Sequence, residues 1–193
     1  MALEQRFQAP PPWTPEALTE MRFSQREVAP ASVLVPLVMR DQVTVLLTLR
    51  TAHLSTHSGQ IAFPGGRVDW QDRDASATAL REAHEEVGLE PEHVRVIGAL
   101  PIYTTGSAFI ITPVVALVQP NFRLKPNALE VDDVFEVPLG FLMDPANHRR
   151  HSMEWNGHTR HWYSMPYMDG AKERFIWGAT AGMLRNLYRF LSA

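Results

Sequence analysis

The chain has 193 residues, of which 45% are hydrophobic and 20% charged, and it carries a net charge of −3 and no cysteine. This composition is typical of one globular domain; it excludes disulfides, thiolate metal sites and a cysteine nucleophile, and it gives no strong positive field for nucleic acid. Residues 1–30 contain charges and prolines rather than a signal sequence, and no apolar run could cross a bilayer. We therefore expect one cytoplasmic domain over residues 1–193, with an N-terminal arm at 1–30 and no membrane or nucleic-acid partner.

Along the chain, the patterns predict strands mixed with helices. Thr14-Pro15 is a typical helix start, so residues 14–23 predict a short helix. Apolar and β-branched runs predict strands at 32–39, 42–48, 93–100, 109–118 and 134–137, the first two forming a hairpin. A helical turn at 139–143, a hairpin at 148–169 around Asn156-Gly157 and a helix at 174–191 complete the series. These elements predict an α/β fold whose sheet has helices on both faces.

The segment from Gly65 to Leu89 is the most informative part of the chain. It contains a predicted helix on which three glutamates share one face, namely Glu82, Glu85 and Glu86. Like charges at this spacing repel one another, whereas Mg²⁺ or Mn²⁺ selects carboxylate oxygens. The helix alone is therefore compatible with a metal site or with a solvated acidic face. Gly65-Gly66, before a polar loop, fits a turn whose backbone oxygens face an ion.

This segment resembles the signature of the Nudix hydrolases, G-x5-E-x7-R-E-U-x-E-E-x-G-U, where U is a bulky apolar residue. The second half matches at Arg81-Glu82, Glu85-Glu86 and Gly88-Leu89. The first half differs, because Asp72 stands at the glutamate position counted from Gly66 and one extra residue precedes Arg81. The resemblance implies an α/β/α sandwich with a mixed sheet and metal-dependent hydrolysis of a nucleotide-derived diphosphate.

A second motif precedes this one. Leu46-Leu47-Thr48-Leu49-Arg50, then Gly59, then Phe63-Pro64-Gly65-Gly66 is similar to the coenzyme A pyrophosphatase branch, LLTxR(S/A)x3Rx3Gx3FPGG. Thr51 and Ser55 depart from it, and Ser55 replaces an arginine that would suit phosphate recognition. His53 and His57 flank this position, and they are either partial substitutes or ordinary loop residues. The resemblance implies substrate contacts from the following residues: Arg50, Ser55, Gly59 and Arg67.

The resemblance and the chemistry of a pyrophosphate bond together suggest roles for the other residues. Glu82 and Glu86, one helical turn apart, are the leading ligands of Mg²⁺ or Mn²⁺, and the backbone oxygen of Gly65 is a further ligand. Glu85 is expected to coordinate a second ion or to orient the attacking water. Arg81 is expected to hold a glutamate in place, the alternative being a surface cation.

The general base is not fixed by the motif. Glu130, in an acidic connection before a short predicted strand, is the best candidate and Glu136 the runner-up, although either could be a solvated acid. Catalysis by Glu85, or activation of the water without a protein base, is also open.

The aromatic-rich hairpin at 148–169 suggests a further possibility. A zinc site at His158-x-x-His161 competes with two other interpretations, phosphate contacts from its arginines and ordinary surface or packing roles for its aromatic residues. The residues concerned are Arg149, Arg150, Arg160, Trp155, Trp162 and Tyr163.

Three functional hypotheses follow. The first is hydrolysis of coenzyme A, a small-molecule nucleotide, to 3′,5′-ADP and 4′-phosphopantetheine. The second keeps the metal chemistry and moves the substrate to ADP-ribose, NADH or a nucleoside triphosphate, because Ser55 replaces the expected arginine. The third is a nucleotide-binding module without turnover. A homodimer is compatible with the sequence but is not required by it.

Overall fold

A mixed eight-stranded sheet forms the centre of the protein; the computed structural model describes residues 2–16, 19–52, 58–155 and 157–193. Its main strands have the order β3-β2-β1-β7-β5, while β4 pairs with β1, β6 with β7 and β8 with β2. The β1–β7 pair is parallel and the other pairs are antiparallel. The strands are β1 (Ala29–Val38), β2 (Thr44–Arg50), β3 (Ile61–Ala62), β4 (Gly65–Arg67), β5 (Val94–Ala99), β6 (Tyr103–Thr104), β7 (Phe109–Val118) and β8 (Val131–Pro138).

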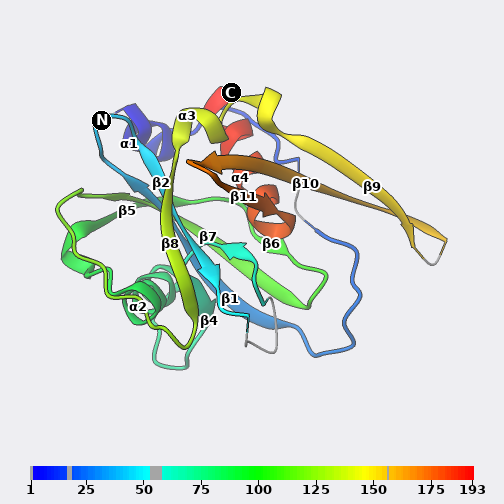
Figure 1. Ribbon diagram of the computed structural model, residues 1–193, viewed down its shortest axis with the longest axis horizontal. Coiled ribbons are helices and arrows are strands. Elements are labelled where there is room, and N and C mark those ends of the chain that lie inside the picture. Colours follow the sequence, from blue (N-terminus) through cyan, green and yellow to red (C-terminus); the bar gives the residue numbers. More distant parts are fainter. Residues whose placement is uncertain (1, 17–18, 53–57, 156) are drawn as a thin grey trace.

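Helices cover both faces of this sheet, as the sequence predicts (Figure 1). Helix α2 lies on one face and α4 on the other, which confirms the α/β/α sandwich. None of the helices in the described parts of the chain is long and apolar enough to cross a membrane. The helices are α1 (Ala2–Gln8), α2 (Ala75–Val87), α3 (Leu139–Leu142) and α4 (Gly178–Ser192), with short 3₁₀ helices η1 (Pro91–His93) and η2 (Pro145–Asn147).

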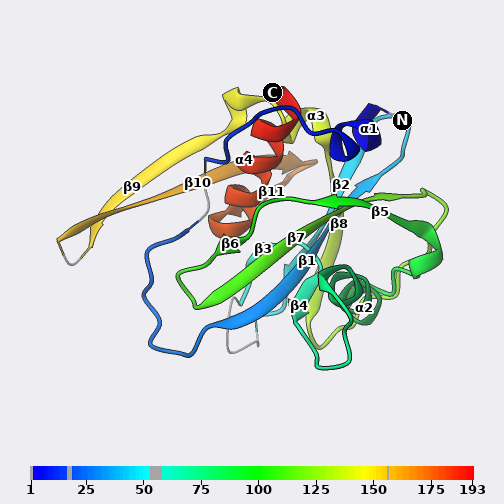
Figure 2. The ribbon, with the colours of Figure 1, turned by 180° about the vertical axis from the view of Figure 1, so that it is seen from behind.

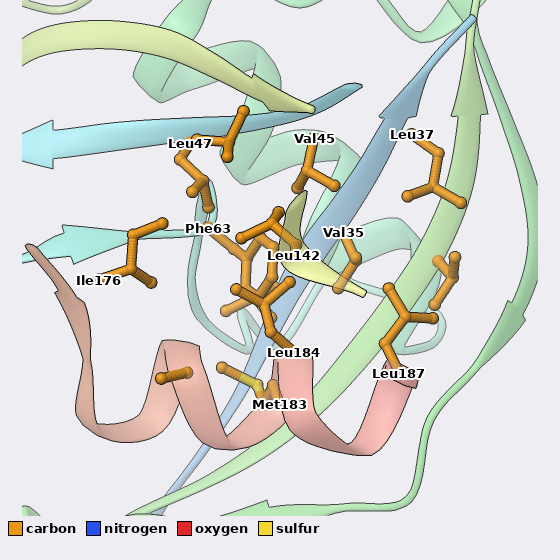
Figure 3. Packing of buried hydrophobic residues seen from close by; sticks show 14 of the residues in the cluster. Val35, Leu37, Val45, Leu47, Phe63, Leu142, Ile176, Met183, Leu184 and Leu187 are labelled. Atoms are coloured by element: carbon orange, nitrogen blue, oxygen red, sulfur yellow. The ribbon is translucent and has the colours of Figure 1, made fainter. Parts of the chain in front are cut away.

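The central strand β1 contributes side chains to both layers of the core. From Ala31 to Val38 it is buried throughout, and its side chains alternate between the two faces because the strand period is two residues. Leu34 packs under α2, whereas Val35 and Leu37 pack under α4. Figure 3 shows the α4 side, where side chains of the helix point into the cluster formed by the strands. The predicted strands 32–39 and 109–118 are thus confirmed.

A second sheet of three antiparallel strands, β9 (Arg149–Trp155), β10 (His158–Asp169) and β11 (Lys172–Trp177), packs against α4. The β9–β10 ribbon confirms the predicted hairpin and extends away from the body of the protein (Figure 1). The predicted helix at 174–191 is wrong at its start. Residues 172–177 pair with β10 as β11, in which burial alternates from Arg174 onward, and the helix begins at Gly178.

The N-terminal arm runs beside α4 before it enters β1 (Figure 2). Within the described residues, 14–16 and 19–23 are not helical, so the predicted helix at 14–23 is wrong. The arm is instead extended and bonds to the β6–β7 region, where the Glu20 amide donates to the Thr104 carbonyl. The helix at the start of the chain, α1, was not predicted; Phe7 packs on Phe190 with 4.5 Å between ring centroids.

Arg174 joins the small sheet to the large one. Only 7% of its side chain is exposed, and it pairs with Asp133 of β8 at 2.7 Å and with Asp169 of β10 at 2.8 Å. Its guanidinium also lies 4.0 Å from the ring centroid of Phe135. A buried guanidinium is costly unless it is paired, so this cluster fixes how the two sheets meet.

We expect Arg174→Ala to lower the free energy of unfolding by about 2 kcal/mol. The loss is smaller than for a fully buried ion pair, because water can solvate the half-exposed partner carboxylates. Lys172→Ala is the matched control, because Lys172 also contacts Asp133 but is 54% exposed; it should cost about 0.5 kcal/mol or less. Urea unfolding at neutral pH measures both values, and equal losses would contradict the bridging role of Arg174.

Candidate active site

The acidic face is built on α2, whose two ends are fixed locally. The Asp74 side chain accepts a hydrogen bond from the Ala77 amide at 2.8 Å, which caps the first turn. The helix ends at Gly88, which adopts φ 68° and donates to the last carbonyls. A side chain at Gly88 would also meet the backbone of Lys125 at 2.8 Å. These two caps set where the glutamates of the helix face the sheet.

The three glutamates differ sharply in exposure. Glu86 has 3% of its side chain exposed, Glu82 has 16% and Glu85 has 56%. Their common face was predicted, and in the structure the exposure of the three side chains increases from Glu86 to Glu82 to Glu85. Glu82 and Glu86 lie against the sheet, and Glu85 lies at the solvent edge. A solvated acidic face does not account for Glu86.

Glu86 is held by two donors. Its Oε2 accepts from the Gly65 amide at 3.0 Å, and its Oε1 accepts from Arg50 Nη1 at 3.1 Å. Burial nevertheless raises the pKa of Glu86 to about 7, and the charges on Glu130 and Glu82 add to this rise. Burial also raises the pKa of Glu82. The fixed donors therefore leave the negative charge at this position incompletely balanced.

Gly65 and Gly66 form a strand rather than the predicted turn. Both belong to β4 and pair with Val33 and Ser32 of β1. The Leu34 amide donates to the Pro64 carbonyl, and hydrogen-bonded pairs alternate with non-hydrogen-bonded pairs along antiparallel strands. Gly65 and Val33, the next pair, therefore form no hydrogen bond with each other. The backbone groups of Gly65 consequently face away from β1, toward α2. A Cβ at Gly66 would lie 2.4 Å from the Glu82 carboxyl carbon, so the strand and the helix need glycine there to approach this closely.

Arg81 connects the loop after β4 to the acidic face. Its Nη1 donates to Glu82 Oε1 at 2.9 Å and to Glu85 Oε2 at 3.0 Å. Its Nε and Nη2 donate to Asp72 at 3.0 and 2.8 Å, and the bond from Arg81 holds the pKa of Asp72 well below its usual range. Arg81 thus contacts a glutamate as expected, and Asp72, which replaces the expected glutamate, contacts Arg81.

Glu130 lies near the two inner glutamates, since its charge contributes to the raised pKa of each. The Asn127 side chain orients it, because Nδ2 donates to Glu130 Oε1 at 3.0 Å. The Asn127 amide in turn donates to the backbone carbonyl of Glu86 at 2.8 Å. Glu136 is not part of this group; it pairs with Arg40 at 2.7 Å and accepts from Thr44.

These residues fit a hard divalent cation. Glu82, Glu86 and Glu130 are opposed by Arg50 and Arg81, and a bound cation would offset the repulsion by Glu82 and Glu130 that adds to the raised pKa of the buried Glu86. Carboxylate oxygens and a backbone carbonyl such as that of Gly65 are suitable donors. Among the described residues, no three acidic or histidine side chains are already grouped as a metal site. The arginines hold the carboxylates in the present arrangement.

A cavity of about 410 Å³ lies against β4 and ends at α4. Arg50 and Arg67, for which substrate contacts are predicted, line this cavity, and Arg50 Nε is buried without a hydrogen-bond partner among the described residues. Gly59, with φ 67°, does not line the cavity. Ser55 lies outside the described residues, as do His53 and His57.

The residues of the β9–β10 ribbon that were considered for zinc or phosphate do not line this cavity. His158 and His161 are three residues apart on a strand, so their side chains point to opposite faces and cannot share one ion. A separate cavity of about 250 Å³ is lined by the following members of the ribbon: Arg150, His161, Trp162 and Tyr163. The described residues of the ribbon therefore do not contribute to the acidic site.

Sequence reasoning missed several residues of this region. Asn127 lies in an irregular connection, and its role depends on contacts with α2. Arg26 of the arm and Trp177, Thr180 and Met183 near the chain end also line the cavity. No local pattern marks these residues, because their partners are distant in the sequence.

Comparisons with known proteins agree with this architecture. The family model of the NUDIX domain matches residues 28–169. A protein of Enterobacter sp. (strain 638) named "Uncharacterized Nudix hydrolase NudL" is 42% identical over 158 residues, which cover 81% of this chain and 80% of that protein. Its namesake in Salmonella dublin is 40% identical over 171 residues, covering 88% and 85%. The structure of a MutT/nudix family protein from Enterococcus faecalis shares the fold, with a TM-score of 0.53 at 15% identity, over 99% of this chain and 68% of that one.

The close approach of Gly66 to Glu82 gives a direct test of the proposed metal face. We expect Gly66→Ala to weaken Mn²⁺ binding at least about tenfold, because the new methyl group displaces a ligand carboxylate and misplaced ligands lose affinity. Gly140→Ala is the control, since a Cβ there meets nothing within 4 Å. Titration of Mn²⁺ by electron paramagnetic resonance measures the affinity; equal binding by both variants would place the metal elsewhere.

Proposed function

This chain belongs to the Nudix hydrolase family, and we propose that its reaction is the hydrolysis of the diphosphate bond of coenzyme A or its derivatives. The products are 3′,5′-ADP and 4′-phosphopantetheine, and the cofactor is Mg²⁺ or Mn²⁺. One observation carries the proposal: Arg50 and Gly65, which donate to the buried Glu86 carboxylate of α2, also line a cavity whose described lining contains arginines and apolar side chains but no acid. Such a cavity suits a substrate that joins negative groups to an apolar portion.

Diphosphate hydrolysis needs positive charge around the reacting oxygens and a correctly placed water. We assign Glu82, Glu86 and the Gly65 carbonyl to the divalent cation, which when bound neutralises the diphosphate charge and lowers the pKa of a coordinated water. Arg81 holds Glu82 and Glu85 in position through its bonds to both. Glu85, at the solvent edge, is assigned to a second ion or to the orientation of the water.

Glu130 is proposed as the general base. Asn127 occupies its Oε1, which leaves Oε2 to accept the proton of the attacking water. As the water oxygen bonds to one phosphorus, the bond between that phosphorus and the bridging oxygen breaks. The bridging oxygen leaves with the second phosphate, so each product keeps a phosphate monoester.

The choice of coenzyme A is supported by the uninterrupted spacing from Leu46 to Gly66 and by the position of Arg50 at the junction of the cavity and Glu86. Ser55, in place of the arginine of that motif, favours a second candidate with the same chemistry and another substrate. ADP-ribose, NADH and nucleoside triphosphates are the compounds concerned. A binding module without turnover does not explain a buried cluster of carboxylates beside the cavity.

A side-by-side assay of coenzyme A, ADP-ribose and NADH with Mg²⁺ or Mn²⁺ tests the substrate. We expect the highest kcat/KM for coenzyme A, because the cavity combines arginines with an apolar interior. Product analysis should give 3′,5′-ADP. Intact coenzyme A alongside cleavage of another compound would overturn the assignment and leave the metal chemistry in place.

Glu86→Gln tests the chemistry itself. We expect kcat to fall roughly 100-fold or more, since the amide removes a negative ligand while keeping the shape of the side chain. The variant should stay folded, because the amide keeps the shape of the side chain, but its melting temperature should fall slightly because the amide nitrogen cannot accept the second of the two hydrogen bonds. Glu92→Gln, at an 80% exposed position, is the matched control and should keep full activity. Normal turnover by the Glu86 variant would contradict the site.

A further inference from the structure

The N-terminal arm supplies a cation to the cavity. Arg26 lines the cavity although it precedes residues 28–169, the region matched by the family model. Arg67 of β4 and Phe109 of β7 line the same cavity as Arg26. The arm therefore adds a charged group to the substrate site from outside the common domain.

The arm is fixed in place over the β6–β7 connection. The Glu20 carboxylate accepts from the Tyr103 hydroxyl at 3.1 Å and from the Gly106 amide at 3.0 Å, and the Phe23 amide donates to the Gly106 carbonyl at 3.0 Å. A Cβ at Gly106 would lie 2.5 Å from the Met21 carbonyl oxygen. The arm thus needs glycine at this position to pack as closely as it does.

Local hydrogen bonds then set the turn that carries Arg26. The Arg26 amide donates to Ser24 Oγ at 3.1 Å, and the Arg26 carbonyl accepts from Arg22 Nη2. These bonds use the backbone of Arg26. Its guanidinium makes no hydrogen bond or ion pair with any residue that the structure describes.

Arg67 is in a similar state. Its guanidinium lies 5.4 Å from the ring centroid of Phe109, and within the described part of the chain it has no carboxylate partner. Arg50, the third arginine on the cavity wall, already pairs with Glu86. Two positive charges at the cavity therefore lack a counter-charge, and the described lining includes no Asp or Glu to provide one.

We propose that Arg26 and Arg67 form a second anion subsite that binds a phosphate monoester of the substrate, separate from the diphosphate held at α2. This inference rests on the proposed function and specifies the substrate class as a diphosphate that carries an additional phosphate. A phosphate monoester has a charge of about −1.5 to −2 at neutral pH, which matches two guanidinium groups. The planar fork of each arginine suits phosphate oxygens. Arg26 is thereby a specificity-determining residue.

The test compares two compounds that differ by one phosphate, coenzyme A and 3′-dephospho-coenzyme A. In wild-type protein we expect the higher kcat/KM for coenzyme A. Arg26→Ala should raise KM for coenzyme A roughly tenfold, the effect of losing one charge-assisted hydrogen bond, and leave KM for the dephospho compound unchanged. Arg123→Ala, which removes the same charge at an exposed position outside the cavity lining, should alter neither value.

A second variant reaches the same subsite without removing a charge. Gly106→Ala should displace the arm and reduce the preference for coenzyme A as Arg26→Ala does, while Gly140→Ala should not. Circular dichroism melting of both variants identifies any loss of folding. A folded Gly106→Ala protein that keeps the full preference would overturn the role of the arm.

Binding measured without turnover separates this inference from the proposed reaction. Isothermal titration calorimetry in EDTA gives Kd for both compounds. Wild-type protein should bind coenzyme A more tightly than the dephospho compound, and Arg26→Ala should bind the two compounds with equal Kd. If Arg26→Ala removes the difference in Kd and neither compound is hydrolysed, the subsite is supported and the reaction is rejected. Hydrolysis with equal Kd values in wild type and variant would reject the subsite and retain the reaction.

Discussion

The whole arrangement depends on one buried carboxylate, that of Glu86. A carboxylate with 3% of its side chain exposed is costly unless it is paired; two segments donate to this carboxylate, and a third bonds to the backbone of Glu86. Strand β4 donates through the Gly65 amide, β2 donates through Arg50, and the connection before β8 reaches the Glu86 carbonyl through Asn127. The pairing of β4 with β1 and the course of the 119–130 connection therefore both help to hold Glu86 in place.

The charged groups near Glu86 and the residues that complete the cavity come from different parts of the chain. Helix α2 and its flanking loops contribute the charged groups suited to the reaction, and they lie within the region of the family model. The cavity beside them is completed by the arm and by residues after 169, such as Trp177 and Met183. Contacts that favour one substrate over another can thus come from segments that take no part in the chemistry.

Local patterns in the sequence predicted the parts of the fold that local physics determines. Strand β7 has the predicted bounds, because it is a long run of apolar residues buried on both faces over much of its length. The helix at 14–23 failed because the capping signal at Thr14-Pro15 is outweighed by bonds to Thr104 and Gly106, more than 80 positions away. The acidic face was predicted from spacing, whereas the burial of Glu86 and the position of Arg26 follow from packing that spacing does not encode.

The contact between the two ends of the chain has a consequence for the order of folding. Arg6 Nε donates to the Phe190 carbonyl across 184 positions, and Arg185 bonds to Glu16 at 2.8 Å. The arm is synthesised well before its partners on α4, which lie more than 160 positions later in the sequence. Since contacts so far apart form slowly, the arm has to wait unpaired while the sheet assembles. The arm is therefore the natural place for a chaperone or protease to distinguish an unfinished molecule from a finished one.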